Sequence, residues 1–203
     1  MKKKLFTLLI FSMSLLLMAQ ENDKLKEIGL TFYNLDNFGM TFKFGNVNGP
    51  WRINSFLING NNSNFTQDSS SRKASRIRLD IRFGKEYRKS ISENFLLRYG
   101  ADLTFNYSYS SSESIISRIE NSNSEDSQIK YEPGINIVLG INYIINKDLI
   151  FGAEYLPGIS YSIIKTKYVR DNDNGVYESG HDTHGISYGL QSGAALLSLS
   201  YRF

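Results

Sequence analysis

Cysteine is absent from the 203 residues, which excludes a lipoprotein acylation site, a disulfide bond and a thiolate metal site. Long apolar runs are scarce as well. No segment reaches the roughly 18 consecutive apolar residues that a membrane-spanning helix needs. Helical periodicity is almost missing from residue 20 onward, so the apolar residues there are not arranged as amphipathic helices.

The longest apolar run, from Leu5 to Met18, follows Lys2, Lys3 and Lys4 and is followed by Ala19. A basic start, a short apolar run and a small residue are typical of a secretory signal peptide. We therefore expect a signal peptide at 1–19 and one domain at 20–203, with a retained anchor helix as the alternative. Three of the 23 Lys and Arg residues, and none of the 20 Asp and Glu residues, lie in 1–19. The mature chain is thus formally neutral, which argues against a nucleic-acid partner.

Alternation of apolar and polar residues recurs along the mature chain and is typical of β-strands. In the segment 97–109, for example, Leu97 and Leu103 share one face, while Arg98 and Asp102 share the other. The same pattern predicts eight strands, at 27–33, 38–45, 51–58, 76–83, 97–109, 129–143, 149–161 and from the end of a polar loop at 169–183 to the C terminus.

Connection lengths and aromatic positions both favour a membrane barrel. The connections 59–74, 110–128 and 169–183 are long and polar, and most of those between them are short. Short periplasmic turns and long outer loops are expected of an outer-membrane barrel with both termini in the periplasm. Aromatic residues also gather near both ends of the predicted strands, as in interfacial girdles: Phe44, Trp51, Phe83, Phe95, Tyr143, Phe151 and Tyr201 at one end, and Tyr107, Tyr109, Tyr131, Tyr161 and Tyr188 at the other.

The alternation also places many charges on the inner face. These are Arg76, Arg78, Asp80, Arg82, Arg98, Asp102, Lys130, Glu132 and Glu154, together with Glu27, Lys43, Arg52 and Arg202. The interior of an eight-stranded barrel is just wide enough for side chains, and buried charges must be paired. We therefore predict an ion-paired plug, with an ion path as the alternative. A hairpin turn centred on Lys89 would place Arg76 opposite Asp102 and Asp80 opposite Arg98.

At the C terminus, Leu197, Leu199, Tyr201 and Phe203 share one face of a strand that must pair with the first strand to close a barrel. This ending resembles the signal read by the barrel-assembly machinery of outer-membrane proteins. As a pattern, residues 25–203 resemble the small eight-stranded barrels of the OmpA transmembrane domain and OmpX type. The resemblance implies an all-β, antiparallel, up-and-down transmembrane barrel in the outer membrane of a Gram-negative bacterium. Outer-membrane lipid and lipopolysaccharide would surround it.

The leading functional hypothesis is a non-enzymatic envelope protein without cofactor or metal. It would support envelope integrity or bind a partner, such as an unidentified protein, through the loops 59–74, 110–128 and 169–183. The alternatives are a narrow solute channel, a lipid-A-modifying enzyme and a subunit of a larger envelope complex.

Two residue groups in the last predicted loop suggest chemistry. Glu178, His184 and Ser187 have the residue types of a hydrolase, but three positions along a strand reverse the face, so His184 and Ser187 point apart. His181 and the fragment 171–175, which starts at Asp171, suggest a divalent-cation loop. Its glycine stands fifth rather than sixth, so we predict no metal site.

Overall fold

The computed structural model describes residues 24–32, 38–67, 70–116, 122–172, 175–189 and 195–203. The expected signal peptide at 1–19 lies outside these residues. In the part described, no helix is long and apolar enough to cross a membrane. Ten antiparallel strands make up nearly all of it: β1 (Lys24–Phe32), β2 (Phe38–Asn46), β3 (Gly49–Gln67), β4 (Ser70–Ser90), β5 (Phe95–Ile116), β6 (Ser122–Ile144), β7 (Leu149–Tyr155), β8 (Gly158–Asn172), β9 (Gly175–Gly189) and β10 (Ala195–Arg202).

Eight of the strands form a closed ring of hydrogen-bonded neighbours. Strands β1 to β6 pair in chain order, β7 pairs with β6 and β10, and β10 pairs with β1. The last pairing sets Glu27 opposite Arg202, which confirms that the final strand closes the ring against the first. Closure pairs the backbone groups that a sheet edge would otherwise leave open.

The order of the ten strands is not the predicted eight-stranded meander. Residues 149–172 are divided into β7 and β8 at Leu156 and Pro157, and both parts pair with β6. Proline has no N–H to donate, so a ladder is readily interrupted there. Of the last two strands, β9 pairs with β8 and β10 pairs with β7.

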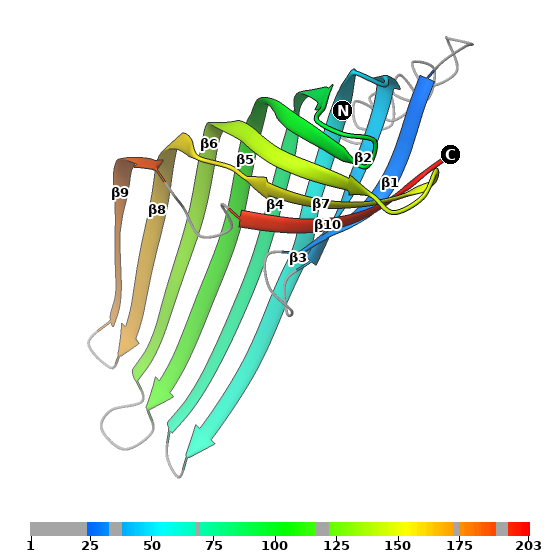
Figure 1. Cartoon of the computed structure of the whole chain (residues 1–203). Helices are drawn as coiled ribbons and strands as arrows, with labels where there is room; N and C mark the ends of the chain where they lie inside the picture. Colours follow the sequence, from blue (N-terminus) through cyan, green and yellow to red (C-terminus); the bar gives the residue numbers. More distant parts are fainter. Residues whose placement is uncertain (1–23, 33–37, 68–69, 117–121, 173–174, 190–194) are drawn as a thin grey trace, which may run out of the picture.

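Four ring strands, β3 to β6, continue past the ring and join β8 and β9 in an open, curved sheet, which runs toward the lower left in Figure 1. We call this part the palisade. Neighbouring strands pair along it, with β3 and β9 at its two edges. Its residues are 59–67 of β3, 70–78 of β4, 108–116 of β5, 122–136 of β6, 158–172 of β8 and 175–189 of β9.

The prediction of long loops at 59–74, 110–128 and 169–183 is wrong. β3 continues to Gln67 and β4 begins at Ser70, and the hairpins β5–β6 and β8–β9 extend in the same way. Both faces of these extensions carry exposed side chains. A sheet without a buried face needs no apolar alternation, although its backbone pairing continues. For this reason the polar sequence of these strand extensions could not be distinguished from that of loops.

The predicted register of the β4–β5 hairpin is also wrong. Its turn lies at Ile91–Asn94, where the Ile91 N–H donates to the Phe95 carbonyl oxygen at 2.9 Å. Arg76 is consequently opposite Ser110, not Asp102. The other pair fails in the same way, since Asp80 faces Asn106 and Arg98 faces Arg88. The predicted connection 84–94 is wrong because residues 84–90 remain in the strand.

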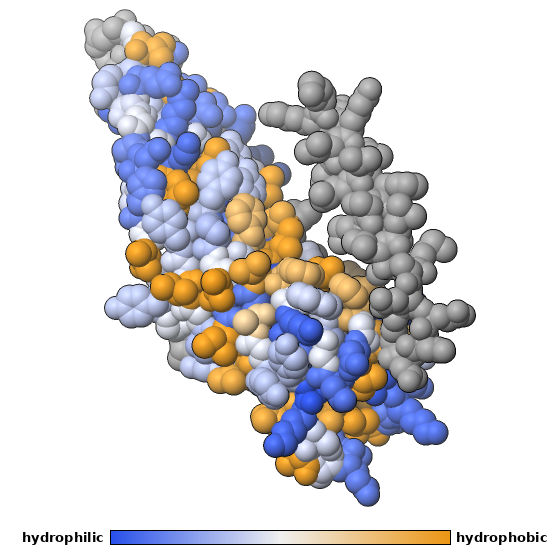
Figure 2. Space-filling view, turned by 90° about the horizontal axis from the view of Figure 1, so that it is seen from above, coloured by the Kyte–Doolittle hydropathy of each residue, from blue (hydrophilic) through white to orange (hydrophobic). Residues whose placement is uncertain are grey.

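Side chains of the ring alternate between an exposed apolar face and a buried polar face. On β5, Leu103 is 62 % exposed and Phe105 also lies outside, whereas Arg98 and Asp102 are each only 1 % exposed. The four apolar residues at the C terminus are exposed too: Leu197, Leu199, Tyr201 and Phe203. In Figure 2 apolar residues form a band across the middle of the visible face, and the extension at upper left is mainly hydrophilic.

Candidate functional site

The interior of the ring is organised around Glu86 of β4, whose side chain is fully buried. Four cations surround its carboxylate, at 2.6 Å for Arg88, 3.1 Å for Lys43, 3.3 Å for Arg98 and 3.5 Å for Arg52. They come from four successive strands, β2 to β5. Because a buried charge is costly unless it is paired, this one carboxylate binds those strands together.

Arg52 of β3 reaches across the ring. Its Nε donates to Asp102 Oδ1 of β5 at 2.8 Å, and Nη2 donates to the second carboxylate oxygen. Its Nη1 donates to Glu154 of β7 at 2.7 Å, and Arg98 lies 3.3 Å from that same carboxylate. Two parallel bonds fix the orientation of a guanidinium, so Arg52 holds three strands in a defined arrangement.

Glu27 of β1 completes the interior where the ring closes. Arg88 donates to its two oxygens at 2.8 and 2.7 Å, and Arg202 of β10 donates to Oε1 at 3.0 and 2.9 Å. Among the described residues, these connected salt bridges include side chains from every ring strand except β6, whose own pair, Lys130 and Glu132, lies within that strand. We call the set the ion network: Glu27, Lys43, Arg52, Glu86, Arg88, Arg98, Asp102, Glu154 and Arg202.

Buried apolar residues lie on both sides of the ion network. Leu25 precedes Glu27 on β1, and Ile150 precedes Glu154 on β7, toward the end of the ring that holds the short turns. Toward the palisade, three buried apolar side chains form a cluster: Val138, Leu156 and Leu196. Side chains therefore occupy the ring along its length, as expected for a barrel of this strand number.

The side chains predicted to face the lumen occupy three places. Buried in the ring, or where the palisade joins it, are Arg82, Arg98, Asp102, Glu132 and Glu154. Partly covered beside them are Asp80, which lies 3.5 Å from Arg82, and Lys130, which lies 2.8 Å from Glu132. Exposed on the palisade are Arg76 and Arg78.

Sequence reasoning missed Glu86, the side chain with the most ion pairs in the network, and its partner Arg88, because it ended the strand before them. A signal was nevertheless present. Arg82 is buried on the inner face. Every second residue after it lies on the same face of β4, which includes Gly84, Glu86 and Arg88.

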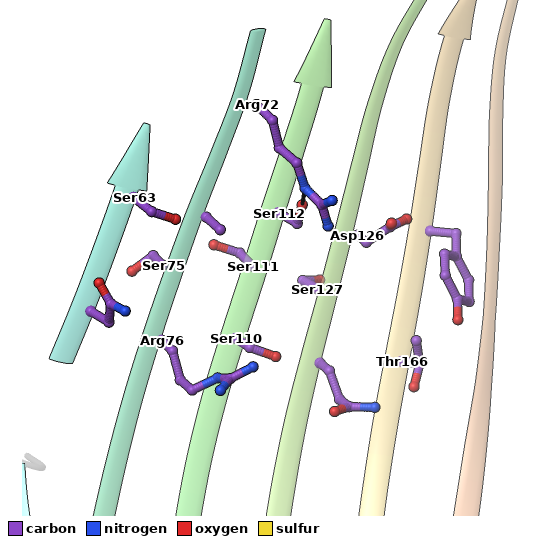
Figure 3. A pocket seen from close by; sticks show the side chains of 14 residues that line it. Ser63, Arg72, Ser75, Arg76, Ser110, Ser111, Ser112, Asp126, Ser127 and Thr166 are labelled. Carbon is purple, nitrogen blue, oxygen red and sulfur yellow. Dashed lines mark hydrogen bonds between the residues drawn. The ribbon is translucent and has the colours of Figure 1, made fainter. Parts of the chain in front are cut away.

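The concave face of the palisade holds a hollow with a volume of about 410 Å³. Arg72 and Arg76 extend from β4 across β5 into it (Figure 3), and Arg72 Nε donates to Ser112 Oγ at 3.1 Å. Tyr168 lines it from β8. The rest of the lining is mostly hydroxyl and amide groups: Asn61, Ser63, Ala74, Ser75, Ser110, Ser111, Ser112, Asp126, Ser127, Gln128 and Thr166.

The structure separates the side chains suggested for hydrolytic chemistry. His184 stacks on Tyr161, and its Nδ1 lies 3.0 Å from the tyrosine hydroxyl. Ser187 lies three positions further along β9 and so faces the other side of the sheet. Glu178 instead pairs with Lys167 at 2.6 Å and raises the pKa of that lysine by accepting its hydrogen bond.

A metal site finds no support in the described residues, since they contain no group of three or more His, Asp or Glu side chains that could hold an ion. His181 stacks on Tyr168 with 5.9 Å between the ring centroids. Of the suggested calcium loop at 171–175, positions 173–174 lie outside the described residues.

No protein-family model and no curated protein matches the chain. Several chains of solved structures resemble it, among them two outer membrane proteins. A major outer membrane protein from Thermus thermophilus has a TM-score of 0.42 and 11 % identity, covering 89 % of this chain and 99 % of that one. CarO from Acinetobacter baumannii has a TM-score of 0.29 and 12 % identity, covering 90 % and 99 %. At these TM-scores the likenesses assign no function to this chain.

Proposed function

We propose that the protein is an integral outer-membrane β-barrel. Its ring is a closed, non-conducting anchor in the lipid, and its palisade stands outside the cell. The observation that carries the proposal is the reversed distribution of side chains in the ring, with apolar residues outside and the ion network inside. In water this arrangement would leave a large apolar belt exposed, whereas lipid covers such a belt and the closed ring leaves no backbone edge unpaired.

The dimensions of the belt support the proposal. On β5 the exposed apolar face runs from Phe95 to Phe105, about 33 Å at roughly 3.3 Å per residue. A strand tilt of about 40° reduces this to roughly 25 Å, the height of the apolar band of outer-membrane barrels. Aromatic pairs mark both borders: Trp51–Phe83 and Phe95–Tyr143 at one, with centroids 5.2 and 5.1 Å apart, and Tyr107–Tyr131 at the other, 5.6 Å apart.

The filled interior favours an anchor over a solute channel. A pore would need water along the axis, where the ion network and the cluster of Val138, Leu156 and Leu196 now lie. The separation of His184 from Ser187 likewise favours a non-enzymatic role. In this orientation the short turns and both termini are periplasmic, and the palisade replaces the expected loops as the recognition surface.

The test uses Trp51, the single tryptophan of the sequence, which is 40 % exposed on the outside of the ring. The full chain is refolded into vesicles that contain lipids brominated at different depths. We expect quenching of Trp51 to be strongest for bromines near the headgroups, together with a gel mobility that changes on heating. Planar bilayers should show no steady open level. A protein that stays in solution without detergent, with unquenched Trp51, would refute the membrane location, and a steady conductance would refute the filled ring.

A further inference from the structure

The concave hollow of the palisade has an unbalanced charge. Arg72 and Arg76 enter it, and Asp126 is its one acidic lining residue among those described. Arg76 is exposed and has no ion pair with any described residue, and Arg72 bonds only the Ser112 hydroxyl there. The guanidinium of arginine matches phosphate and carboxylate geometry. The hollow can therefore bind an anionic group beside β4.

Most of the remaining lining suits a polyhydroxylated ligand. Hydroxyl and amide groups such as Ser63, Ser110, Gln128 and Thr166 supply donors and acceptors from four different strands. Tyr168 adds an aromatic ring that is 41 % exposed and is supported by stacking on His181. Among the described residues, the lining has no apolar side chain besides this ring and Ala74, whereas protein-binding surfaces are usually anchored by aromatic and aliphatic side chains.

We propose that this hollow binds an anionic glycan, that is, a saccharide carrying carboxylate or phosphate groups. Arg72 and Arg76 hold the anionic group, the hydroxyl and amide side chains hold the sugar hydroxyls, and Tyr168 packs against a sugar ring. A volume of about 410 Å³ exceeds what a lone phosphate would fill and is large enough for sugar units. Glycan binding requires the folded palisade but not the membrane location. The glycan proposal and the membrane-anchor proposal can therefore fail independently.

The experiment is calorimetric titration of the full chain in detergent micelles. The probes are hexagalacturonate, glucose 6-phosphate, neutral maltohexaose and inorganic phosphate. We expect binding of the two anionic sugars only, with Arg76→Gln and Arg72→Gln each weakening it about tenfold. Asp126→Asn should strengthen it, because a repelling carboxylate is lost. The matched control is Lys73→Gln, which removes the same charge from the position next to Arg72 but from the opposite face of β4, and should change affinity less than twofold.

The inference is overturned by equal binding of maltohexaose, by equal binding of inorganic phosphate, or by equal weakening by Lys73→Gln and Arg76→Gln. Absence of binding to both anionic sugars would overturn it as well. Heat-modifiable migration of every variant shows whether the barrel is intact. If an intact barrel binds no glycan, the ligand is refuted while the proposed anchor is not. Preference between the carboxylated and the phosphorylated sugar identifies the anionic group.

Discussion

Glu86 provides the sharpest test of the filled ring, because one substitution alters its centre. Glu86→Gln keeps the size of the side chain but removes its charge. The carboxylate is fully buried and lies within 3.5 Å of four cations. The ion network has five cations and four acids, so the variant leaves five cations with three acids. The negative charge is removed at a buried position, where water cannot screen the repulsion between the remaining cations.

We expect Glu86→Gln to lower the free energy of unfolding by about 3–5 kcal/mol, the usual result of removing one partner from a buried ion pair. At roughly 2–4 °C per kcal/mol for a domain of this size, the unfolding temperature falls by about 6–20 °C. The double variant Lys43→Met, Glu86→Gln also removes a cation and restores the original excess of one. It should therefore be more stable than Glu86→Gln alone.

The assay follows the gel mobility of the refolded protein against temperature, and Trp51 fluorescence against urea in vesicles. Glu93→Gln, the same substitution at an exposed turn position, is the control and should stay within about 0.5 kcal/mol of the wild type. The reasoning fails if Glu86→Gln unfolds at the wild-type temperature. It also fails if the double variant is less stable than the single one.

Three further predictions concern the outside of the molecule and its strand packing. Leu103→Lys places a charge in the apolar belt and should cost about 2–4 kcal/mol in urea titrations in vesicles, whereas Val176→Lys at the palisade tip should cost little. Gly84→Ala adds a Cβ that overlaps the backbone of β5, and the same titration should show a loss of about 1–3 kcal/mol. Glu178→Gln should leave the unfolding temperature unchanged and lower the pKa of Lys167, measured by NMR. The raised pKa means that any stabilisation by this pair is present at neutral pH and lost only at higher pH.

For the lumen, residue parity predicts which face of a strand a side chain occupies but not which side chain it contacts. Parity alone put Arg52, Arg98 and Glu154 on the inner face, and the structure buries all three. It did not identify their partners, because the partner of a residue depends on the register between strands. The register of β4 against β5 corresponds to a turn at Ile91–Asn94. Residue parity does not locate this turn, because its position depends on pairing along the whole hairpin.

In the palisade, by contrast, residue parity does not reveal the strands at all. Sequence patterns detect a strand through the contrast between its two faces, and that contrast vanishes where both faces meet water. In β3 a register shift between Phe56 and Asn59 also exchanges the faces, so that Asn61 and Ser63 line the hollow. The consecutive apolar residues at 56–58 break the alternation there but do not specify the register beyond them, so the hollow could not be predicted.

The amino-acid sequence by itself determined that the chain is β-structured, that apolar side chains cover one face of its strands and charges the other, and that the last strand pairs with the first. These properties follow from a period of two residues, which is local. The tertiary structure alone decided which charges meet in the ion network, where the ring ends and that Arg72 and Arg76 share a hollow. Each of these depends on the stagger between strands far apart in the chain, which is set by closing the ring and by the two hairpin turns on either side of a strand.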